Sequence, residues 1–222
     1  MATARSRPAL LFDLDGTLAD TALDIASALD ATLADLSLPL AGIAQTRQWI
    51  GGGAPALVSR ALDTLAPDYD DRQVEQALNV FMHHYEHYNG THCKLYPGVA
   101  DTFSELRAND ISMACVTNKP YRFAVAVLDK FALSDHFTCV IGGDSLALKK
   151  PDPLPLHTAL GSLQATAENS WMIGDSATDV NAARNAGVRS AWVSYGYHQG
   201  LGPAELEPDR VLQEFSEVLG LT

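Results

Sequence analysis

Short apolar runs that alternate with helical patterns are the feature of this sequence that most restricts its fold. The apolar runs lie at 8–12, 111–116, 137–141, 170–173 and 190–194. Apolar residues at helical spacing separate the later runs, over about 98–108, 120–131, 153–163 and 177–186. Near-continuous apolar strands that alternate with helices are typical of a parallel sheet buried on both faces. We therefore expect an α/β fold with a doubly wound, Rossmann-like parallel sheet.

The stretch from about 20 to 90 has a different pattern and contains no convincing strand. Apolar residues recur at helical spacing near its start, as at Leu29 and Leu33, and again near its end, as at Phe81 and Tyr85. The glycine run Gly51–Gly53 lies between these parts and precedes a third predicted helix. The pattern predicts a small helical bundle inserted after the first strand.

These two patterns predict two domains. We expect residues 1–18 and 94–222 to form the α/β core, and residues 19–93 to form an all-helical cap. Turn residues in "YNGTH" and "LYPG" would return the chain from the cap to the core.

Charge and cysteine content exclude several classes of protein. The 222 residues include 27 acidic and 15 basic side chains, giving a formal net charge of −12. This balance argues against nonspecific nucleic-acid binding, which depends on basic surfaces. Three widely spaced cysteines without a CxxC pair argue against a disulfide framework and favour a reducing cytoplasm. We expect a cytoplasmic protein with no membrane partner, because no apolar run is long enough for a signal peptide or a membrane span.

Polar side chains follow each of the first four predicted strands of the core. The carboxyl ends of parallel strands meet at one edge of the sheet, where ligands bind at the point at which the strand order reverses. Carboxylates, a hydroxyl, an amide and lysines would therefore gather there: Asp13, Asp15, Thr117, Asn118, Lys119, Lys149, Lys150, Asp175 and Asp179.

The charges in this set predict phosphoryl chemistry. Clustered carboxylates need a cation, and hard oxygen ligands suit Mg²⁺, with Asp13 and Asp175 as the natural metal ligands. The metal and Lys150 would keep Asp13 ionised and nucleophilic. Thr117, Lys150 and the backbone amides near Asn118 would hold the oxygens of an anion. Phosphoryl transfer needs little beyond such placement and positive charge.

The remaining polar residues are predicted to have supporting roles. Asp15, offset from the metal, could protonate a leaving oxygen and later activate a water molecule. Asp179 is expected behind the metal ligands rather than among them. Lys149 is expected to be solvated, with Lys150 in the ammonium role. His83 and His87, one helical turn apart, are expected on an exposed helix face rather than in a zinc site.

Four motifs, "DLDGTL", "VTNKP", "KPDP" and "GDSATD", resemble in order those of the haloacid dehalogenase superfamily. The resemblance implies an α/β core with a helical cap and an aspartyl-phosphate formed on Asp13. It also implies that Asp15 is the acid/base. Mg²⁺ would be held by Asp13, the backbone carbonyl of Asp15, and Asp175. The dehalogenase branch lacks the second aspartate, so Asp15 favours phosphate chemistry.

Longer phrases such as "WIGGGAPALVSRAL" and "VIGGDSLALKKPDPLPL" resemble bacterial phosphoglycolate phosphatases. That resemblance implies a small phosphorylated metabolite as partner, with 2-phosphoglycolate giving glycolate and phosphate. The family usually has Asn where Gly52 stands, so a contact of Gly52 with substrate is a weaker expectation. Arg47, just before the glycine run, is a candidate to pair with a substrate carboxylate, against the alternative of a solvated arginine.

Three alternative functions are compatible with the same residues. The chain could hydrolyse another small phosphate ester or pyrophosphate, or act as a phosphomutase. Outside the enzymes, it could be a phosphate-binding regulatory protein, although such a protein would be expected to have lost part of the motif set. A monomer or a homodimer fits the sequence equally well.

Overall fold

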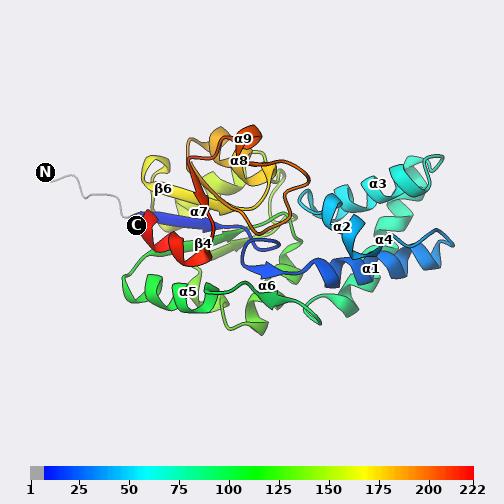
Figure 1. Cartoon of the computed structure of the whole chain (residues 1–222), viewed down its shortest axis with the longest axis horizontal. Coiled ribbons are helices and arrows are strands. Elements are labelled where there is room, and N and C mark those ends of the chain that lie inside the picture. Colours follow the sequence, from blue (N-terminus) through cyan, green and yellow to red (C-terminus); the bar gives the residue numbers. More distant parts are fainter. Residues whose placement is uncertain (1–7) are drawn as a thin grey trace, which may run out of the picture.

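The computed structural model describes residues 8–222, and Figure 1 shows a sheet-containing part beside a smaller helical part. Residues 1–7 of the expected core segment 1–18 lie outside the described residues. Among residues 8–222, no helix combines the length and the apolar character that crossing a membrane requires.

A six-stranded sheet with every neighbouring pair parallel forms the larger part, in the order β5-β4-β1-β6-β7-β8. Its strands are β1 (Ala9–Phe12), β4 (Ser112–Val116), β5 (Cys139–Ile141), β6 (Ser170–Gly174), β7 (Arg189–Val193) and β8 (Arg210–Leu212). The chain adds β4 and β5 on one side of β1, then β6, β7 and β8 on the other. The strand order therefore reverses at β1, which confirms the expected doubly wound α/β sheet.

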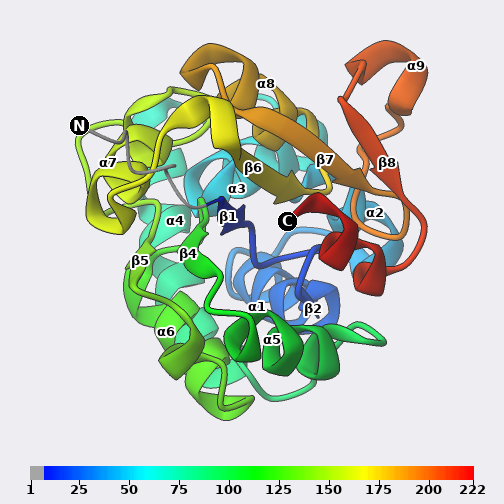
Figure 2. The ribbon, with the colours of Figure 1, turned by 90° about the vertical axis from the view of Figure 1, so that its left-hand side faces the viewer.

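Helices cover both faces of this sheet, as Figure 2 shows. Leu10 and Phe12 of β1 face a core formed with α5 (Val99–Ala108), α6 (Tyr121–Lys130) and the C-terminal 3₁₀ segment η3 (Phe215–Leu221). Ala9 and Leu11 face the opposite core, formed with α7 (Leu154–Leu163) and α8 (Ala177–Ala186). Successive β1 side chains point to opposite faces, so an uninterrupted apolar run is what a two-sided core requires.

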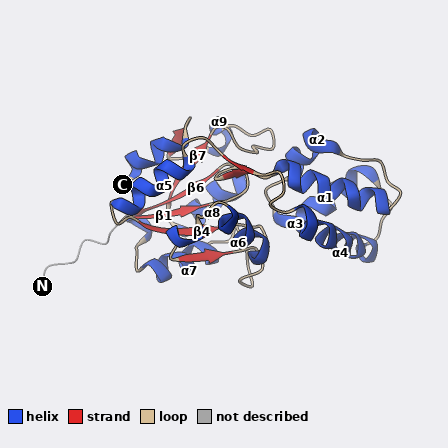
Figure 3. Ribbon diagram, turned by 90° about the horizontal axis from the view of Figure 1, so that it is seen from below, coloured by secondary structure: helices blue, strands red, loops and turns tan. Residues whose placement is uncertain are grey.

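Four helices form the smaller part, at one end of the molecule beyond the sheet (Figure 3). They are α1 (Ala22–Asp35), α2 (Gly42–Trp49), α3 (Gly53–Leu65) and α4 (Asp71–Tyr88). We call them the helical unit. Its interior is apolar and includes Leu29, Leu62 and Phe81, each at most 2% exposed. The helical spacing in the sequence thus marks the faces that pack together.

A two-stranded antiparallel ribbon joins the two parts. It consists of β2 (Ala19–Asp20) and β3 (Lys94–Leu95), with Ala19 opposite Leu95. The expected domain boundaries fall inside this ribbon, because they assign β2 to the cap and β3 to the core. The chain therefore leaves and re-enters the larger part at neighbouring positions.

Several short elements were not expected from the sequence. They are the edge strand β8, the ribbon strands, the helix α9 (Pro203–Leu206) and the 3₁₀ segments η1 (Ser134–His136), η2 (Ala167–Asn169) and η3. Each is too short to give a periodic apolar signal, and each lies at an edge or a connection.

Candidate active site

A cavity lies where the carboxyl ends of β1, β4 and β6 meet the helical unit. The space that it encloses is about 520 Å³ when its open mouth is included. Both parts of the molecule contribute to its wall, which is lined by Asp13, Asp15, Ile25, Ile50, Gly51, Gly53, Ala54, Leu57, Phe81, Tyr85, Thr117, Asn118, Lys119, Pro120 and Asp175.

Asp13 follows directly after β1 and is held by its backbone, which donates to the carbonyl of Ile173 at 2.9 Å. The ammonium of Lys150 lies 3.1 Å from Asp13 Oδ1. Burial raises the pKa of Asp13 to about 6, while the charge of Lys150 acts in the opposite direction. Oδ1 is buried, and no donor among the described residues is oriented to form a hydrogen bond with it. Apart from the ion pair with Lys150, Oδ1 therefore has room for a further ligand.

Three buried carboxylates gather at this point, since oxygens of Asp13, Asp175 and Asp179 lie within 4.8 Å of one another. Burial and the two neighbouring charges raise the pKa of Asp175 well above its usual range. Asp179 accepts from Lys150 Nζ at 2.6 Å and from the hydroxyl of Ser176 at 2.7 Å. Asp179 therefore accepts hydrogen bonds from protein donors.

Gly16 is required for the approach of Asp175 to this cluster. Its φ is +83°, and a Cβ at this position would lie 2.1 Å from Asp175 Oδ2. Asp175 Oδ2 accepts from the backbone N–H of Tyr197 at 2.5 Å, and Oδ1 accepts from the hydroxyl of Thr17 at 3.3 Å. These contacts fix the orientation of the Asp175 carboxylate.

The carboxylate cluster fits a hard divalent cation. The residues offer oxygen ligands only, which suits Mg²⁺. Asp13 Oδ1 has no hydrogen-bond donor, and the upward pKa shifts of Asp13 and Asp175 reflect excess negative charge and burial. A bound cation would give Asp13 Oδ1 a further partner and would offset the negative charge of the buried carboxylates.

Asp15 has different neighbours, although it lies only two residues after Asp13. Asp15 Oδ1 accepts from the hydroxyl of Thr21 at 2.7 Å and from Lys119 Nζ at 2.9 Å. Lys119 also donates to the hydroxyl of Tyr85, which comes from α4. Burial lowers the pKa of Lys119, but the attraction of Asp15 and Tyr85 outweighs it, so the net shift is upward. The carboxylate of Asp15 lies outside the three-aspartate cluster.

Thr117 and Asn118 follow β4 and line the cavity, as their place in the sequence suggests. The Asn118 side chain donates to the carbonyl of Lys150 at 2.9 Å and thereby connects two strand ends. The backbone N–H of Lys119 donates to Thr117 Oγ1 and that of Tyr121 to Asp144, so these two amides have protein acceptors.

Arg47 and Gly52 do not line the cavity. Arg47 is 45% exposed and pairs with Asp20 at 2.8 Å, a position that fits the alternative of a solvated arginine. Gly51 and Gly53 face the cavity, but the carbonyl of Gly52 accepts from Lys149 Nζ at 2.8 Å. The expectation that Lys149 is solvated is therefore wrong, because the glycine run gives its ammonium a partner.

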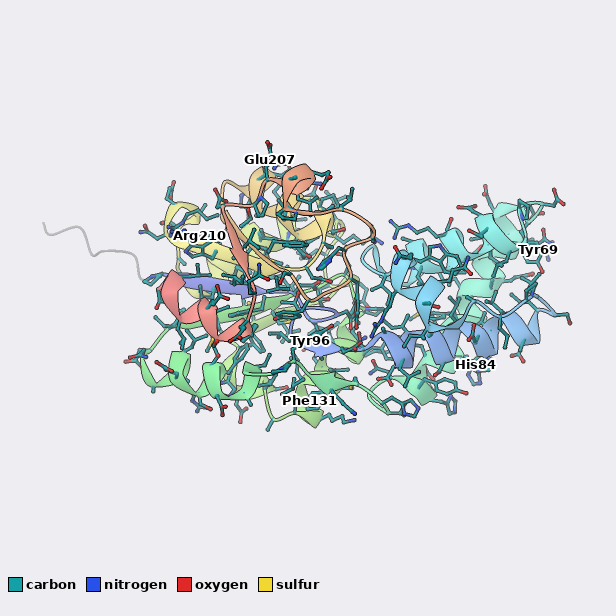
Figure 4. The ribbon with its side chains drawn as sticks, in the orientation of Figure 1. Tyr69, His84, Tyr96, Phe131, Glu207 and Arg210 are labelled. Atoms are coloured by element: carbon teal, nitrogen blue, oxygen red, sulfur yellow. The ribbon has the colours of Figure 1, made fainter. Side chains whose placement is uncertain are left out.

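The histidines of α4 lie apart from this site. Figure 4 shows His84 on the outer side of the helical unit, where its ring lies 2.7 Å from Asp35. His83 and His87 are exposed, as expected. The group of metal-ligating side chains found among residues 8–222 consists of aspartates alone.

Three further contributors, Thr17, Tyr85 and Tyr197, were not identified from the sequence, and Lys119 was placed at the sheet edge without a role. Lys119 belongs to the strand-end motif "VTNKP", so its position was visible while its partner was not. Tyr85 fits the apolar pattern of its helix, so the sequence gives no sign that its hydroxyl contacts Lys119.

Comparisons with known proteins agree with this geometry. A family model described as haloacid dehalogenase-like hydrolase matches residues 10–193. The phosphoglycolate phosphatase of Pseudomonas fluorescens (strain Pf0-1) is 42% identical over 214 residues, covering 95% of this chain and 78% of that protein. The phosphoglycolate phosphatase of Yersinia pestis is 40% identical, covering 94% of this chain and 90% of that protein.

Solved structures show the same architecture. A predicted phosphoglycolate phosphatase from Haemophilus somnus superposes with a TM-score of 0.90 at 30% identity, covering 96% of each chain. CbbY from Rhodobacter sphaeroides, solved in complex with phosphate, gives a TM-score of 0.81 at 25% identity, also covering 96% of each chain. The family model spans most of the sequence, and the sheet carries its aspartates at the strand ends. The chain belongs to the haloacid dehalogenase-like hydrolases.

Proposed function

We propose that this protein is a Mg²⁺-dependent phosphomonoester hydrolase that acts through an aspartyl-phosphate on Asp13. The observation that carries the proposal is the position of the Asp13 carboxylate. It lines the cavity, lies 3.1 Å from Lys150 Nζ, and has an oxygen with no hydrogen-bond donor among the described residues. A buried carboxylate beside a fixed cation, with an oxygen that accepts no hydrogen bond from the described residues, is suited to nucleophilic attack on phosphorus.

The side chains divide the two half-reactions between them. An Asp13 oxygen forms a bond to phosphorus while the bond to the ester oxygen breaks, and Asp15 gives that oxygen a proton. Water then attacks the phosphorus of the aspartyl-phosphate, Asp15 takes the proton of the water, and the Asp13 carboxylate is regenerated with release of phosphate. Lys150 favours the ionised form of Asp13 throughout, and Thr117 and Asn118 line the region in which the phosphoryl oxygens would lie.

Asp13 and Asp175 would hold the Mg²⁺, together with the backbone carbonyl of Asp15. When bound, the ion supplies positive charge to the phosphoryl oxygens. Asp179 keeps Lys150 in place through its 2.6 Å contact and does not need to ligate the ion. The orientation of Asp175 by Tyr197 and Thr17 supports the same assignment.

The helical unit would act as the cap, corresponding to the expected segment 19–93. Apolar side chains of this unit, including Leu57 and Phe81, line the cavity opposite the aspartates. A wall of this kind excludes water from the first half-reaction. The three cysteines are unpaired, which fits a cytoplasmic enzyme.

The substrate that we propose is 2-phosphoglycolate, which gives glycolate and phosphate. Support comes from relatives about 40% identical that carry this name and cover nearly the whole chain. CbbY, a structure of the same fold, was solved in complex with phosphate, which supports a phosphate compound as ligand of this chain.

The mechanism can be tested by replacing the nucleophile. Asp13→Asn is expected to abolish turnover of 2-phosphoglycolate and to prevent labelling of the protein by radioactive substrate phosphate in acid-quenched samples. Asp101→Asn, which removes an exposed carboxylate on α5, is the matched control and should retain both. Turnover by Asp13→Asn at the wild-type rate would overturn the proposal.

A further inference from the structure

The cavity wall holds one permanent positive charge among the described residues that line it, and that charge belongs to Lys119. Lys150, the other buried lysine nearby, is engaged with Asp13 and Asp179 on the nucleophile side. The two ammonium groups therefore serve different carboxylates, Lys150 that of Asp13 and Lys119 that of Asp15.

The ammonium group of Lys119 has more N–H donors than it has acceptors among the described residues. An ammonium group has three N–H donors. One reaches Asp15 Oδ1 at 2.9 Å and another reaches the hydroxyl of Tyr85. The side chain of Lys119 is only 1% exposed, it lines the cavity, and two acceptors for its three donors are found among the described residues. Leaving the third donor unpaired in so buried a position would be costly. Tyr85 accepts from Lys119 and keeps its own O–H hydrogen to donate.

We propose that Lys119 Nζ, assisted by the hydroxyl of Tyr85, binds the carboxylate of the substrate. The enzyme would then select phosphate esters of 2-hydroxy carboxylic acids over esters without an acidic group. This inference rests on the proposed function, since it assumes that Asp15 faces the leaving oxygen.

The chemistry of such esters matches the spacing of the two side chains. In the phosphate ester of a 2-hydroxy acid, the ester oxygen and the carboxylate are attached to the same carbon atom. A group that binds the carboxylate must therefore stand beside the group that protonates the ester oxygen. Lys119 Nζ and Asp15 Oδ1 are 2.9 Å apart, which meets this requirement.

The rest of the wall offers little to compete for the carboxylate. The helical unit faces the aspartates with apolar side chains, namely Ile25, Ile50, Ala54, Leu57 and Phe81. An anion in such surroundings binds where a charged donor is already fixed. Tyr85 belongs to α4 and Lys119 follows β4, so a carboxylate held by both would contact both parts of the molecule.

The test compares two esters that differ only in this group. Ethyl phosphate has a methyl group where 2-phosphoglycolate has its carboxylate. The selectivity is the ratio of kcat/KM for 2-phosphoglycolate to kcat/KM for ethyl phosphate, measured on the full chain with Mg²⁺. Lys119→Met is expected to lower this ratio on the order of 100-fold, since a buried charge-assisted hydrogen bond is lost. Tyr85→Phe, which keeps the ammonium, is expected to lower it about 10-fold.

Lys149→Met is the matched control. It removes the same charge from a lysine that also bridges the two parts, but that donates to the carbonyl of Gly52 and does not line the cavity. The selectivity of this variant should equal that of the wild type.

An unchanged selectivity in Lys119→Met would overturn the inference even if both rates fell, because Lys119 would then act only through Asp15. Equal hydrolysis of both esters by the wild type would also overturn it, while leaving the phosphatase assignment intact. Hydrolysis of neither ester would instead point to failure of the proposed function.

A second measurement needs no variant at Lys119. Glycolate should inhibit the wild-type enzyme far more strongly than glycolamide, its neutral analogue of similar shape. Equal inhibition by the two compounds would contradict a carboxylate site.

Discussion

Two buried carboxylates, one in each part of the molecule, show how the parts differ. Asp24 in the helical unit accepts hydrogen bonds from the backbone of Gly90 at 2.9 Å and of His92 at 2.7 Å. Asp13 at the end of β1 is also buried, yet its Oδ1 is ion-paired with Lys150 at 3.1 Å and accepts no hydrogen bond from residues 8–222. Asp24 holds residues 90–92, which lead from α4 back to the sheet, and each of its carboxylate oxygens accepts a hydrogen bond. Asp13 is held in place by its backbone, and its carboxylate is the group that we propose as the nucleophile.

The comparison extends to the surroundings of these residues. The sheet edge gathers Asp13, Lys150, Asp175 and Asp179, all buried. The helical unit supplies mainly aliphatic and aromatic side chains to the same cavity. Charged groups are thus concentrated at the edge of the sheet, while the helices contribute mainly apolar side chains to the wall, which we propose excludes water. The following predictions test this division of roles.

The largest effect is expected at Lys150, whose ammonium contacts Asp13 and Asp179. Lys150→Met should reduce kcat by roughly 100- to 1,000-fold, because a fixed charge is removed from the site. It should also lower the free energy of unfolding by about 4 kcal/mol in the absence of divalent ions, since buried carboxylates lose their partner. Steady-state kinetics and urea unfolding in a chelator check both values.

The neighbouring residue provides the control for this prediction. Lys149→Met removes the same charge but only one hydrogen bond to a backbone carbonyl, so it should cost about 1 kcal/mol or less. Similar losses in the two variants would show that the position of the charge does not matter.

Substitutions at two fully buried phenylalanines distinguish an effect on stability from an effect on activity. Phe103 packs beneath the sheet, and Phe81 packs in the helical unit and lines the cavity. Each substitution by Ala should cost about 3 kcal/mol of unfolding free energy. Phe103→Ala should keep the wild-type KM well below its melting temperature, whereas Phe81→Ala should raise KM. Unfolding and kinetic measurements on both variants give the comparison, and an unchanged KM in Phe81→Ala would contradict the role of the wall.

A smaller effect is expected from Mg²⁺ and pH. Burial raises the pKa of Asp13 from 3.8 to about 6, so the folded protein binds a proton more tightly than the unfolded chain. Without the ion, the contribution of Asp13 to stability therefore falls as pH rises through this window. Mg²⁺ competes with that proton, so its stabilising effect should increase over the same window. At ~30 times Kd it should add about 2 kcal/mol above pH 6 and less near pH 4.

Thermal unfolding with and without Mg²⁺ at several pH values measures this linkage. Asp175→Asn should reduce the Mg²⁺ effect at every pH. A stabilisation by Mg²⁺ that is equal across the pH range would show that the ion binds elsewhere.

The sequence was informative where a local pattern determines the structure. The apolar run before Asp13 predicted a buried central strand, because a strand covered on both faces has no polar alternation. The reversal of strand order then brought Thr117 and Asp175 to the same edge, as the topology of parallel sheets requires. The fold and the positions of these side chains were therefore predictable.

Contacts between distant segments were not predictable from the same patterns. The pairing of Lys119 with Tyr85 depends on how α4 lies against the sheet edge, which neither segment encodes alone. Arg47 stands near the glycine run in the sequence, yet its helix directs it to Asp20 at the surface. Local spacing indicates which residue types are present, whereas tertiary packing decides which of them meet.

The central position of β1 has a consequence for the order in which the protein folds. Ala9 of β1 pairs with Ser112 of β4 and with Ser170 of β6, both far along the chain. Contacts between residues so distant in sequence slow folding, because a long loop must close before they form. The helices α1–α4 are complete before either partner strand has been synthesised. We expect the first strand to wait unpaired on the ribosome while the helical unit folds, and its insertion between β4 and β6 to limit the rate of folding.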